Sequence, residues 1–338
     1  MLTLMFRVFG RAKRSPHVYL FLVPVLVLVL VLQVLVGQVQ VVVQVKRLPG
    51  IADGCAHVYL DVGSNIGVQV RKLYEPEKYR GAPVLRLFDE YFGSSRRSQV
   101  CTFGFEANPV HFRRLEEIQK CYRSKGYRVS FFVPQAVSTS NMETVEFSVT
   151  QNATNSDGGS FVLDGQSRPD SSKTVRVETI DLWAWLEDNI FHRRLPSGYG
   201  PGKKKPVVVM KMDVEGEEMK ILPRLVMHSA LCLDKIDFIY YEEHRHRAAV
   251  IPSTYKIDGV AMDFSHAIQL QSLDPNCEPT RIMNLDDETY GHDHLDDDTG
   301  WRSDDPKIYM DDLCQTSSKI SDNFECENSW WCKDLIQR

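Results

Sequence analysis

Three acidic residues stand at the ends of short apolar runs that are typical of buried strands. They are Asp61, Glu106 and Asp213. In open α/β sheets, ligands bind beyond the carboxyl ends of the strands. The sequence therefore predicts that these carboxylates lie along one edge of a parallel sheet, where they could bind hydroxyl or cationic groups of a ligand.

Asp61 opens a loop of sequence D-V-G-S-N-I-G at residues 61–67. A dinucleotide-binding loop reads G-x-G-x-x-G and receives a pyrophosphate. Here Asp61 takes the place of the first glycine, and its charge would repel a pyrophosphate but attract the cationic methionyl end of S-adenosylmethionine. Gly63 and Gly67 would let the backbone approach such a cofactor closely. The loop favours S-adenosylmethionine over NAD.

Glu106 ends the neighbouring strand, where a carboxylate can accept hydrogen bonds from both hydroxyls of a ribose. A third strand is expected at residues 128–134. Gln135, Ala136 and Val137 would close this strand, where they could border an adenine or pack in the core.

Strands and helices alternate along the middle of the chain. Strands are expected at residues 57–61, 100–106, 128–134, 206–213 and 236–242, and helices at residues 68–79, 110–123, 179–187 and 214–222. Residues 76–98 are expected to form an insertion, and residues 141–178 hairpins or a loop over a site. The alternation predicts an α/β fold with a mostly parallel sheet and helices on both faces.

The motifs in this order resemble those of the FkbM family of S-adenosylmethionine-dependent methyltransferases. They are Y-L-D-V-G-S-N-I-G at residues 59–67, F-G-F-E-A-N-P at 103–109, V-E-T-I-D at 177–181 and M-K-M-D-V-E-G-E-E at 210–218. The resemblance extends over roughly residues 55–245. It implies a Rossmann-like class I methyltransferase fold, S-adenosyl-L-methionine as cofactor, and O-methylation of a hydroxyl, often on a sugar or polyketide.

The residues expected to bind this cofactor lie in the loops after the first three strands. They are Asp61, Gly63, Ser64, Asn65, Gly67, Glu106, Asn108 and Ala136. Methyl transfer from a sulfonium requires alignment of the acceptor and removal of one proton from its hydroxyl.

The candidates for this catalytic role are Asp213 and Glu215 after the fourth strand, and Glu243 and His244 after the fifth, with Asp213, Glu215 and His244 preferred. Asp213 could instead orient its loop, Glu215 could cap a helix, and His244 could belong to a solvated charged run. No bound metal is expected.

The N-terminal region has the pattern of a membrane anchor. Residues 17–36 are almost wholly Val, Leu and Phe, and no Asp, Glu, Lys or Arg occurs between Arg14 and Lys46. About twenty such residues span a bilayer core. More basic residues precede this run than follow it closely, which predicts a cytosolic tail at residues 1–16.

We therefore expect a single-pass type II membrane protein with an anchor and stalk at residues 17–45 and its globular part in the lumen of the secretory pathway, with the Golgi favoured. A cleaved signal is the alternative, but the run is longer than a usual signal and lacks a convincing cleavage site. Asn152 begins an N-A-T glycosylation sequon. With the resemblance, this topology favours a glycan or glycolipid as acceptor.

Eight cysteines suit an oxidising compartment, where disulfides persist. Four of them fall in residues 274–338, which also hold 17 of the 45 acidic but 6 of the 40 basic residues. We expect a methyltransferase domain at residues 50–273 and an acidic, disulfide-stapled tail at 274–338. A zinc site in the tail lacks CxxC spacing. Nucleic acid is not an expected partner, since the chain has no polybasic arm.

Other function classes stay open. The D-D-D run at residues 296–298 would suit a metal-dependent glycosyltransferase, but no apolar strand precedes it, which favours a solvated loop. A metal-bridged catechol-type methyltransferase would use Asp213. A non-catalytic protein that kept the fold is the third alternative, and the intact set of Asp61, Gly63, Gly67 and Glu106 argues against it.

Overall fold

The computed structural model describes residues 49–150, 159–161, 172–242, 244, 255–257, 260–262, 275–287 and 289. The chain divides into two units, Met1–Leu48 and Pro49–Arg338, and all described residues belong to the second. The expected anchor at 17–36, the sequon at Asn152 and the acidic run at 296–298 lie outside the described residues. Within the described part, no helix has the length and apolar character needed to cross a membrane.

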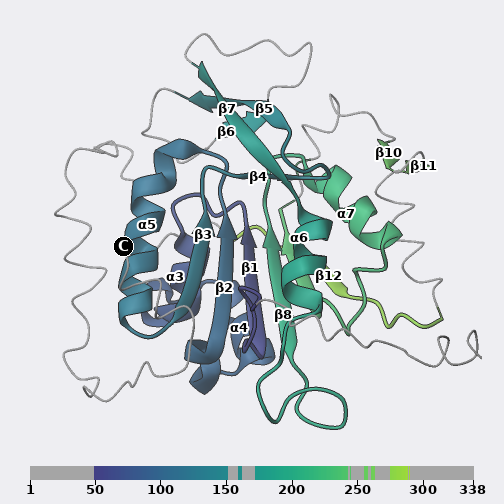
Figure 1. The fold of residues 1–338 in the computed structure, drawn as a ribbon. Coiled ribbons are helices and arrows are strands. Elements are labelled where there is room, and N and C mark those ends of the chain that lie inside the picture. The colour runs from purple at the N-terminus through teal and green to yellow at the C-terminus, as the bar shows by residue number, and fades with distance from the viewer. Residues whose placement is uncertain are drawn as a thin grey trace, which may run out of the picture. The chain divides into compact units, whose positions relative to one another are not determined.

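Six strands form the central sheet, in the order β12-β9-β8-β1-β2-β3 (Figure 1). They are β1 (His57–Val62), β2 (Val100–Phe105), β3 (Arg128–Phe132), β8 (Val207–Met212), β9 (Phe238–Tyr241) and β12 (Arg281–Asn284). All of their pairings are parallel. The chain runs outward from β1 to β3 and then returns to the other side of β1. The point of reversal therefore lies between β1 and β8, and the predicted parallel sheet is confirmed.

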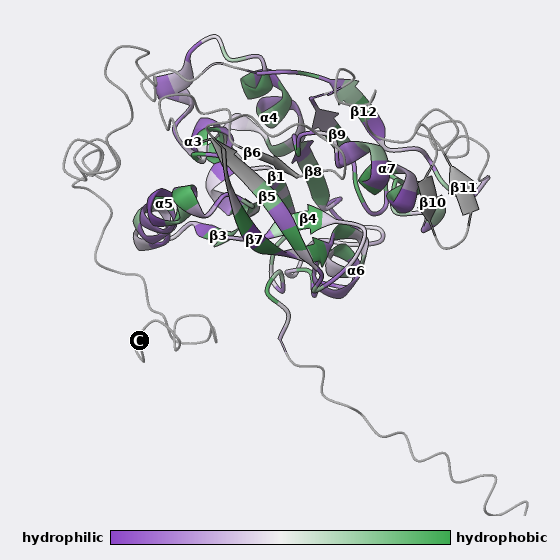
Figure 2. Ribbon diagram, turned by 90° about the horizontal axis from the view of Figure 1, so that it is seen from above, coloured by the Kyte–Doolittle hydropathy of each residue, from purple (hydrophilic) through white to green (hydrophobic). Residues whose placement is uncertain are grey.

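The central strands are buried on both faces, which explains their nearly continuous apolar sequences. In β1, Val58, Leu60 and Val62 belong to one hydrophobic cluster, whereas Tyr59 belongs to the other. Successive side chains of a strand point to opposite faces, so β1 contributes to two cores. Figure 2 shows hydrophobic residues along these strands.

Helices cover both faces of the sheet, as predicted. On the face of Tyr59 lie α3 (Val68–Tyr74), α4 (Val84–Phe92) and α5 (Phe112–Ser124), and on the other lie α6 (Leu182–Leu186) and α7 (Glu218–Met227). In Figure 2, α6 lies on the side of the sheet opposite to α3 and α4. The expected insertion at residues 76–98 contains α4 and the 3-10 helices η1 (Pro76–Tyr79) and η2 (Ser94–Gln99).

Three predicted helix boundaries are wrong. The helix expected at 179–187 begins only at Leu182, because residues 179–181 end strand β7 (Ser172–Asp181). The other two differ because of local backbone chemistry. The helix expected at 68–79 stops at Tyr74, since the residue before Pro76 is disfavoured in helical conformation. The helix expected at 214–222 begins only at Glu218, because Glu215 and Gly216 have positive φ angles of 57° and 109°.

A second sheet lies beside the carboxyl edge of the first (Figure 1). Its order is β4-β7-β5-β6, with strands β4 (Ala136–Ser138), β5 (Thr144–Thr150), β6 (Gly159–Phe161) and β7 (Ser172–Asp181). The β5–β6 and β5–β7 pairings are antiparallel, which confirms the expected hairpin structure. The third central strand was predicted too long: β3 ends at Phe132, and Ala136 begins β4 instead.

Asp181 links the second sheet to helices α6 and α7. It ends β7 and caps α6, and its Oδ1 accepts hydrogen bonds from the amides of Trp183 and Ala184 at 3.1 and 3.4 Å. Arg224 of α7 donates to both carboxylate oxygens, at 3.1 and 2.5 Å. This pair of a buried carboxylate and a partly buried guanidinium holds α7 beside α6 and so positions Glu218, the first residue of α7.

Disulfides tie the sheet to its flanking segments. Cys55 pairs with Cys101 of β2, and Cys232 pairs with Cys277. Cys121 is disulfide-bonded as well. Cys277 and β12 both lie in the segment expected as an acidic tail, and the pairing of β12 with β9 makes residues 281–284 part of the central sheet.

Candidate functional site

The loop after β1 is held against β2 by hydrogen bonds. The amides of Gly63 and Ser64 donate to the carbonyl oxygen of Phe105 at 3.0 and 2.8 Å. The hydroxyl of Ser64 donates to the carbonyl oxygen of Asp61 at 2.9 Å. Ser64, an expected cofactor residue, therefore uses its side chain to close the turn.

The two glycines of this loop are required by close packing within the protein. Gly63 and Gly67 have φ angles of 85° and 84°. A Cβ at Gly63 would lie 1.7 Å from the carbonyl oxygen of Asp213, and one at Gly67 would lie 2.8 Å from Cδ1 of Ile118. The loop after β1 thus lies against the end of β8, at the point where the strand order reverses.

Asp61 is fully buried, and neither of its carboxylate oxygens has a hydrogen-bond partner among the described residues. Burial raises the pKa of Asp61 to about 6, although the positive charge of Lys211 opposes this shift. Leaving a buried polar group without a partner costs about 1–3 kcal/mol. A ligand that brings a cation or hydrogen-bond donors to Asp61 would remove that cost.

Glu106 joins the loops that follow β1 and β2. Its Oε2 accepts a hydrogen bond from the amide of Asn65 at 2.6 Å, and its Oε1 accepts one from the amide of Asn108 at 2.7 Å. Burial raises the pKa of Glu106 to about 7, and the two amide hydrogen bonds act in the opposite direction. Each carboxylate oxygen can accept a second hydrogen bond, so Glu106 can still bind hydroxyl groups.

Two other expected cofactor residues support the local fold. The Oδ1 of Asn108 accepts a hydrogen bond from the amide of Val110 at 3.1 Å and caps the 3-10 helix η3 (Pro109–His111). Ala136 is buried and packs with Phe147 and Val177 in the second sheet. The Ala136 side chain thus contributes to packing.

Lys211 is a site residue that the sequence analysis missed. Its Nζ donates to the carbonyl oxygen of Gly63 at 2.6 Å and to Oδ2 of Asp213 at 2.9 Å. Burial alone would lower the pKa of Lys211, but the charges of Asp213 and Asp61 raise it above its usual value. The sequence did contain a signal for this role, because Lys211 is a charged residue within the otherwise apolar strand β8.

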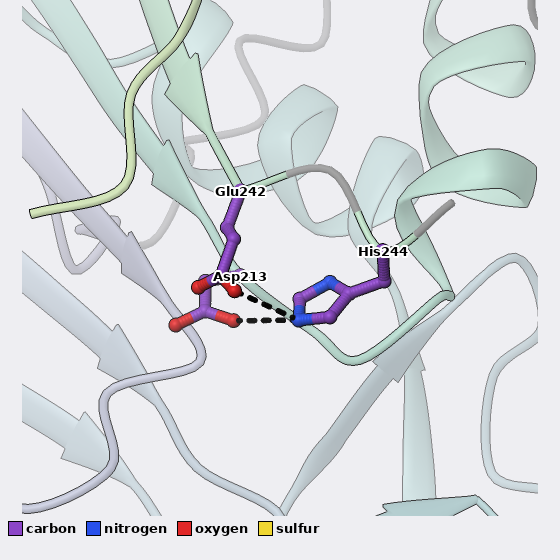
Figure 3. Close-up of side chains that lie close together, drawn as sticks. All are labelled: Asp213, Glu242 and His244. Atoms are coloured by element: carbon purple, nitrogen blue, oxygen red, sulfur yellow. Dashed lines mark ion pairs between the residues drawn. The ribbon is translucent and has the colours of Figure 1, made fainter. Parts of the chain in front are cut away.

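Asp213, Glu242 and His244 gather at the carboxyl ends of β8 and β9 (Figure 3). The Nε2 of His244 lies 3.8 Å from Oδ1 of Asp213 and 3.4 Å from Oε1 of Glu242. Glu215 joins them, with its Oε2 3.5 Å from the same nitrogen. The structure therefore brings together the predicted Asp213, Glu215 and His244 and adds Glu242, whereas Glu243 lies outside the described residues.

Glu218 lies behind His244 and was also missed. Burial alone would lower the pKa of His244, but hydrogen bonds to Glu218 and Glu242 raise it to about 10. With that pKa, the imidazole is protonated near neutral pH and cannot accept another proton. The carboxylates of Asp213, Glu215 and Glu242, each 26–31% exposed, are then the available bases.

A family model described as the methyltransferase FkbM domain matches residues 61–273. The chain belongs to the FkbM methyltransferase family. The match covers more than half of the chain and contains every expected site residue, from Asp61 to His244. The resemblance predicted from the sequence is confirmed, and an FkbM methyltransferase domain requires a methyl donor and an acceptor. No curated protein and no solved structure matches the chain.

Proposed function

We propose that this FkbM domain is an S-adenosylmethionine-dependent O-methyltransferase whose cofactor binds over the loop at residues 61–67. The observation that carries the proposal is Asp61, a fully buried carboxylate with both oxygens unpartnered among the described residues. It lies at the reversal of strand order, where open α/β sheets bind ligands. S-adenosylmethionine supplies a methyl group on a cationic sulfonium, and it also carries an ammonium group that Asp61 can pair with.

Glu106 supports the other half of the cofactor. Its two hydrogen bonds from backbone amides hold the carboxylate in one orientation, and its remaining lone pairs can accept the hydroxyls of a ribose. Lys211 donates to the carbonyl oxygen of Gly63 in the loop and pairs with Asp213, and Arg114 donates to the carbonyl oxygen of Ile66 at 2.8 Å. The three carboxylates of Asp61, Glu106 and Asp213 outnumber these two cations, which favours a cationic ligand.

The cluster after β8 and β9 supplies the base. Methyl transfer to a hydroxyl releases one proton, and Asp213, Glu215 and Glu242 are carboxylates that an acceptor can reach because each is partly exposed. Asp213 joins the two halves of the site, since its carbonyl group packs on Gly63 and its side chain contacts the cluster.

We further propose that residues 17–36 anchor the chain as a type II membrane protein and that the domain acts on a glycan or glycolipid in the Golgi lumen. The apolar N-terminal run and disulfides such as Cys55–Cys101 and Cys232–Cys277 support this location, because disulfides persist in oxidising compartments. An endoglycosidase-sensitive mass shift at Asn152 in cells tests it. Labelling of the domain by cytosolic reagents would contradict it.

Calorimetric titration of S-adenosylmethionine into the purified full-length chain tests the cofactor. We expect saturable binding that Asp61→Asn and Glu106→Gln each weaken at least about tenfold, since each removes one charged contact. Asp89→Asn is the matched control, because Asp89 is a half-exposed acid on α4 that pairs with Arg97. A folded wild-type chain that binds a nucleotide sugar but no S-adenosylmethionine would contradict the methyltransferase proposal.

A further inference from the structure

Figure 3 shows the carboxylates of Asp213 and Glu242 beside the imidazole of His244, a combination of side chains that can bind a metal ion. One donor atom from each of Asp213, Glu242 and His244 lies within 4.8 Å of the other two. An octahedral cation with bonds of about 2.1 Å holds adjacent ligands about 3 Å apart. The observed distances of 3.4 and 3.8 Å from Nε2 to the carboxylate oxygens are therefore close to those of an assembled site.

The orientation of His244 is the observation that separates this cluster from an ordinary group of acids. Its side chain is 4% exposed, with Nδ1 3.1 Å from Oε1 of the fully buried Glu218. Histidines that bind metals commonly donate their second nitrogen to a carboxylate in this way, and the ion displaces the proton that Nε2 carries in the metal-free chain. Nε2 then faces Asp213, Glu215 and Glu242 at 3.4–3.8 Å. Nε2 therefore faces the carboxylate oxygens that would share an ion with it.

The charges of the cluster also favour a cation. Asp213, Glu215, Glu242 and Glu218 bring four carboxylates to the surroundings of one imidazole. Among the described residues, the opposing charges in contact with these carboxylates are Lys211, which pairs with Asp213, and at most one on His244. Within this described part of the chain the cluster carries more negative than positive charge, which a bound dication would reduce.

We propose that Asp213, Glu242 and His244 bind a divalent transition-metal ion of the Mn²⁺ type. Carboxylate oxygens suit Mg²⁺, Ca²⁺ and Mn²⁺, whereas imidazole suits transition metals, and Mn²⁺ accepts both kinds of ligand. Glu215 lies beside the site as a fourth carboxylate, and Glu218 orients His244 without contacting the ion.

The role of the ion rests on the proposed methyl transfer. A cation beside the acceptor hydroxyl lowers the pKa of that hydroxyl. The hydroxyl proton passes to Glu215, and the oxygen lone pair forms a bond to the methyl carbon. The bond from that carbon to sulfur breaks, and its electron pair stays on the sulfur, which becomes neutral. The site thereby offers one carboxylate as base while two others hold the ion.

Titration of MnCl₂ into the metal-free full-length chain, followed by the electron paramagnetic resonance signal of free Mn²⁺, tests the site without any methyl transfer. We expect one bound ion per chain. Asp213→Asn, Glu242→Gln and His244→Gln should each weaken binding at least about tenfold, because each removes a ligand. Glu242→Gln is the safest of these for folding, since Glu242 is the most exposed of the three residues.

The matched controls are His192→Gln and Glu187→Gln. These residues form a partly exposed pair with Nε2 and Oε1 2.7 Å apart, outside the cluster. They should leave Mn²⁺ binding unchanged. Mn²⁺ binding that is unaffected by all three ligand variants, or absent from a wild-type chain that binds S-adenosylmethionine, overturns the metal site. Site-specific Mn²⁺ binding by a chain that fails to bind S-adenosylmethionine supports the metal site and contradicts the proposed function instead.

Discussion

Glu218 and His244 form a buried pair that joins the start of α7 to the end of β9. The Oε1 of Glu218 accepts a hydrogen bond from the backbone amide of His244 at 3.2 Å and lies 3.1 Å from its Nδ1. The other oxygen, Oε2, accepts a hydrogen bond from the amide of Gly216 at 2.8 Å. These contacts set the orientation of the ring and direct Nε2 toward Asp213 and Glu242.

Glu218→Gln should therefore weaken Mn²⁺ binding by about 10–100-fold, the usual effect of removing a partner behind a metal-bound histidine. Glu217→Gln is the control, because Glu217 is a buried neighbour that contacts Ser138 and Lys220 instead. The Mn²⁺ titration and a thermal melt of both variants measure the effect. Equal losses of Mn²⁺ affinity would show that the Glu218–His244 contact has no specific role.

Asp61→Asn should stabilise the folded chain while weakening cofactor binding. The folded-state pKa of Asp61 is raised from 3.8 to about 6, so the folded state holds its proton to higher pH than the unfolded state. Stability is then lost as pH rises from about 4 to 6 and stays reduced above that window. Removing the carboxylate should recover about 1–3 kcal/mol at pH 7.5. Urea denaturation measures this difference, and a less stable variant would indicate that Asp61 has a partner in the free protein.

Binding of S-adenosylmethionine should strengthen as pH rises. Asp61 and Glu106 have pKa values of about 6 and 7, and both must be ionised to pair with a cation and to accept ribose hydroxyls. Between pH 5.5 and 8 the affinity should increase at least about tenfold and then level off. Calorimetry at four pH values measures the profile, and Glu106→Gln should flatten its upper part. Affinity that does not change with pH in the wild-type chain would argue against both contacts.

Gly63→Ala should damage the site far more than Gly81→Ala. Both glycines have positive φ angles, of 85° and 92°. A Cβ at Gly81 meets no atom within 4 Å, whereas one at Gly63 would lie 1.7 Å from the carbonyl oxygen of Asp213. Gly81→Ala should cost about 1–2 kcal/mol from its backbone conformation alone. Gly63→Ala should cost more and abolish cofactor binding, as measured by urea denaturation and calorimetry. Similar losses in the two variants would exclude the steric explanation.

The Cys232–Cys277 disulfide should stabilise the edge of the sheet that carries β9 and β12. It closes a segment with a sequence separation of 45 residues. A loop of that length corresponds to about 4 kcal/mol of unfolding free energy in the chain-entropy description. The Cys232→Ser/Cys277→Ser double variant should melt at a lower temperature than the oxidised wild-type chain. Unchanged melting would mean that β12 and β9 hold together without the covalent link.

The sequence alone was sufficient to place Asp61, Glu106 and Asp213 at strand ends. Each follows a local apolar run, and the rule that ligands bind at the carboxyl edge of a parallel sheet needs no knowledge of strand order. The parallel sheet covered by helices follows from the same local patterns, because burial on both faces produces continuous apolar strands. The family resemblance supported Glu215 beside Asp213, and the same rule for strand ends suggested His244 after the fifth strand.

Only the tertiary structure decided which side chains share the site with them. Glu242 and His244 reach Asp213 because β8 and β9 are paired in parallel. The spacing of residues along the chain determines neither the order nor the register of the strands. Glu218 resembles its neighbouring acids in sequence, and it is distinguished by a late helix start that turns it inward. The pairing of strands that are distant in the sequence depends on interactions across the whole core. The sequence therefore determined where the strands end, and the tertiary structure determined which side chains meet at those ends.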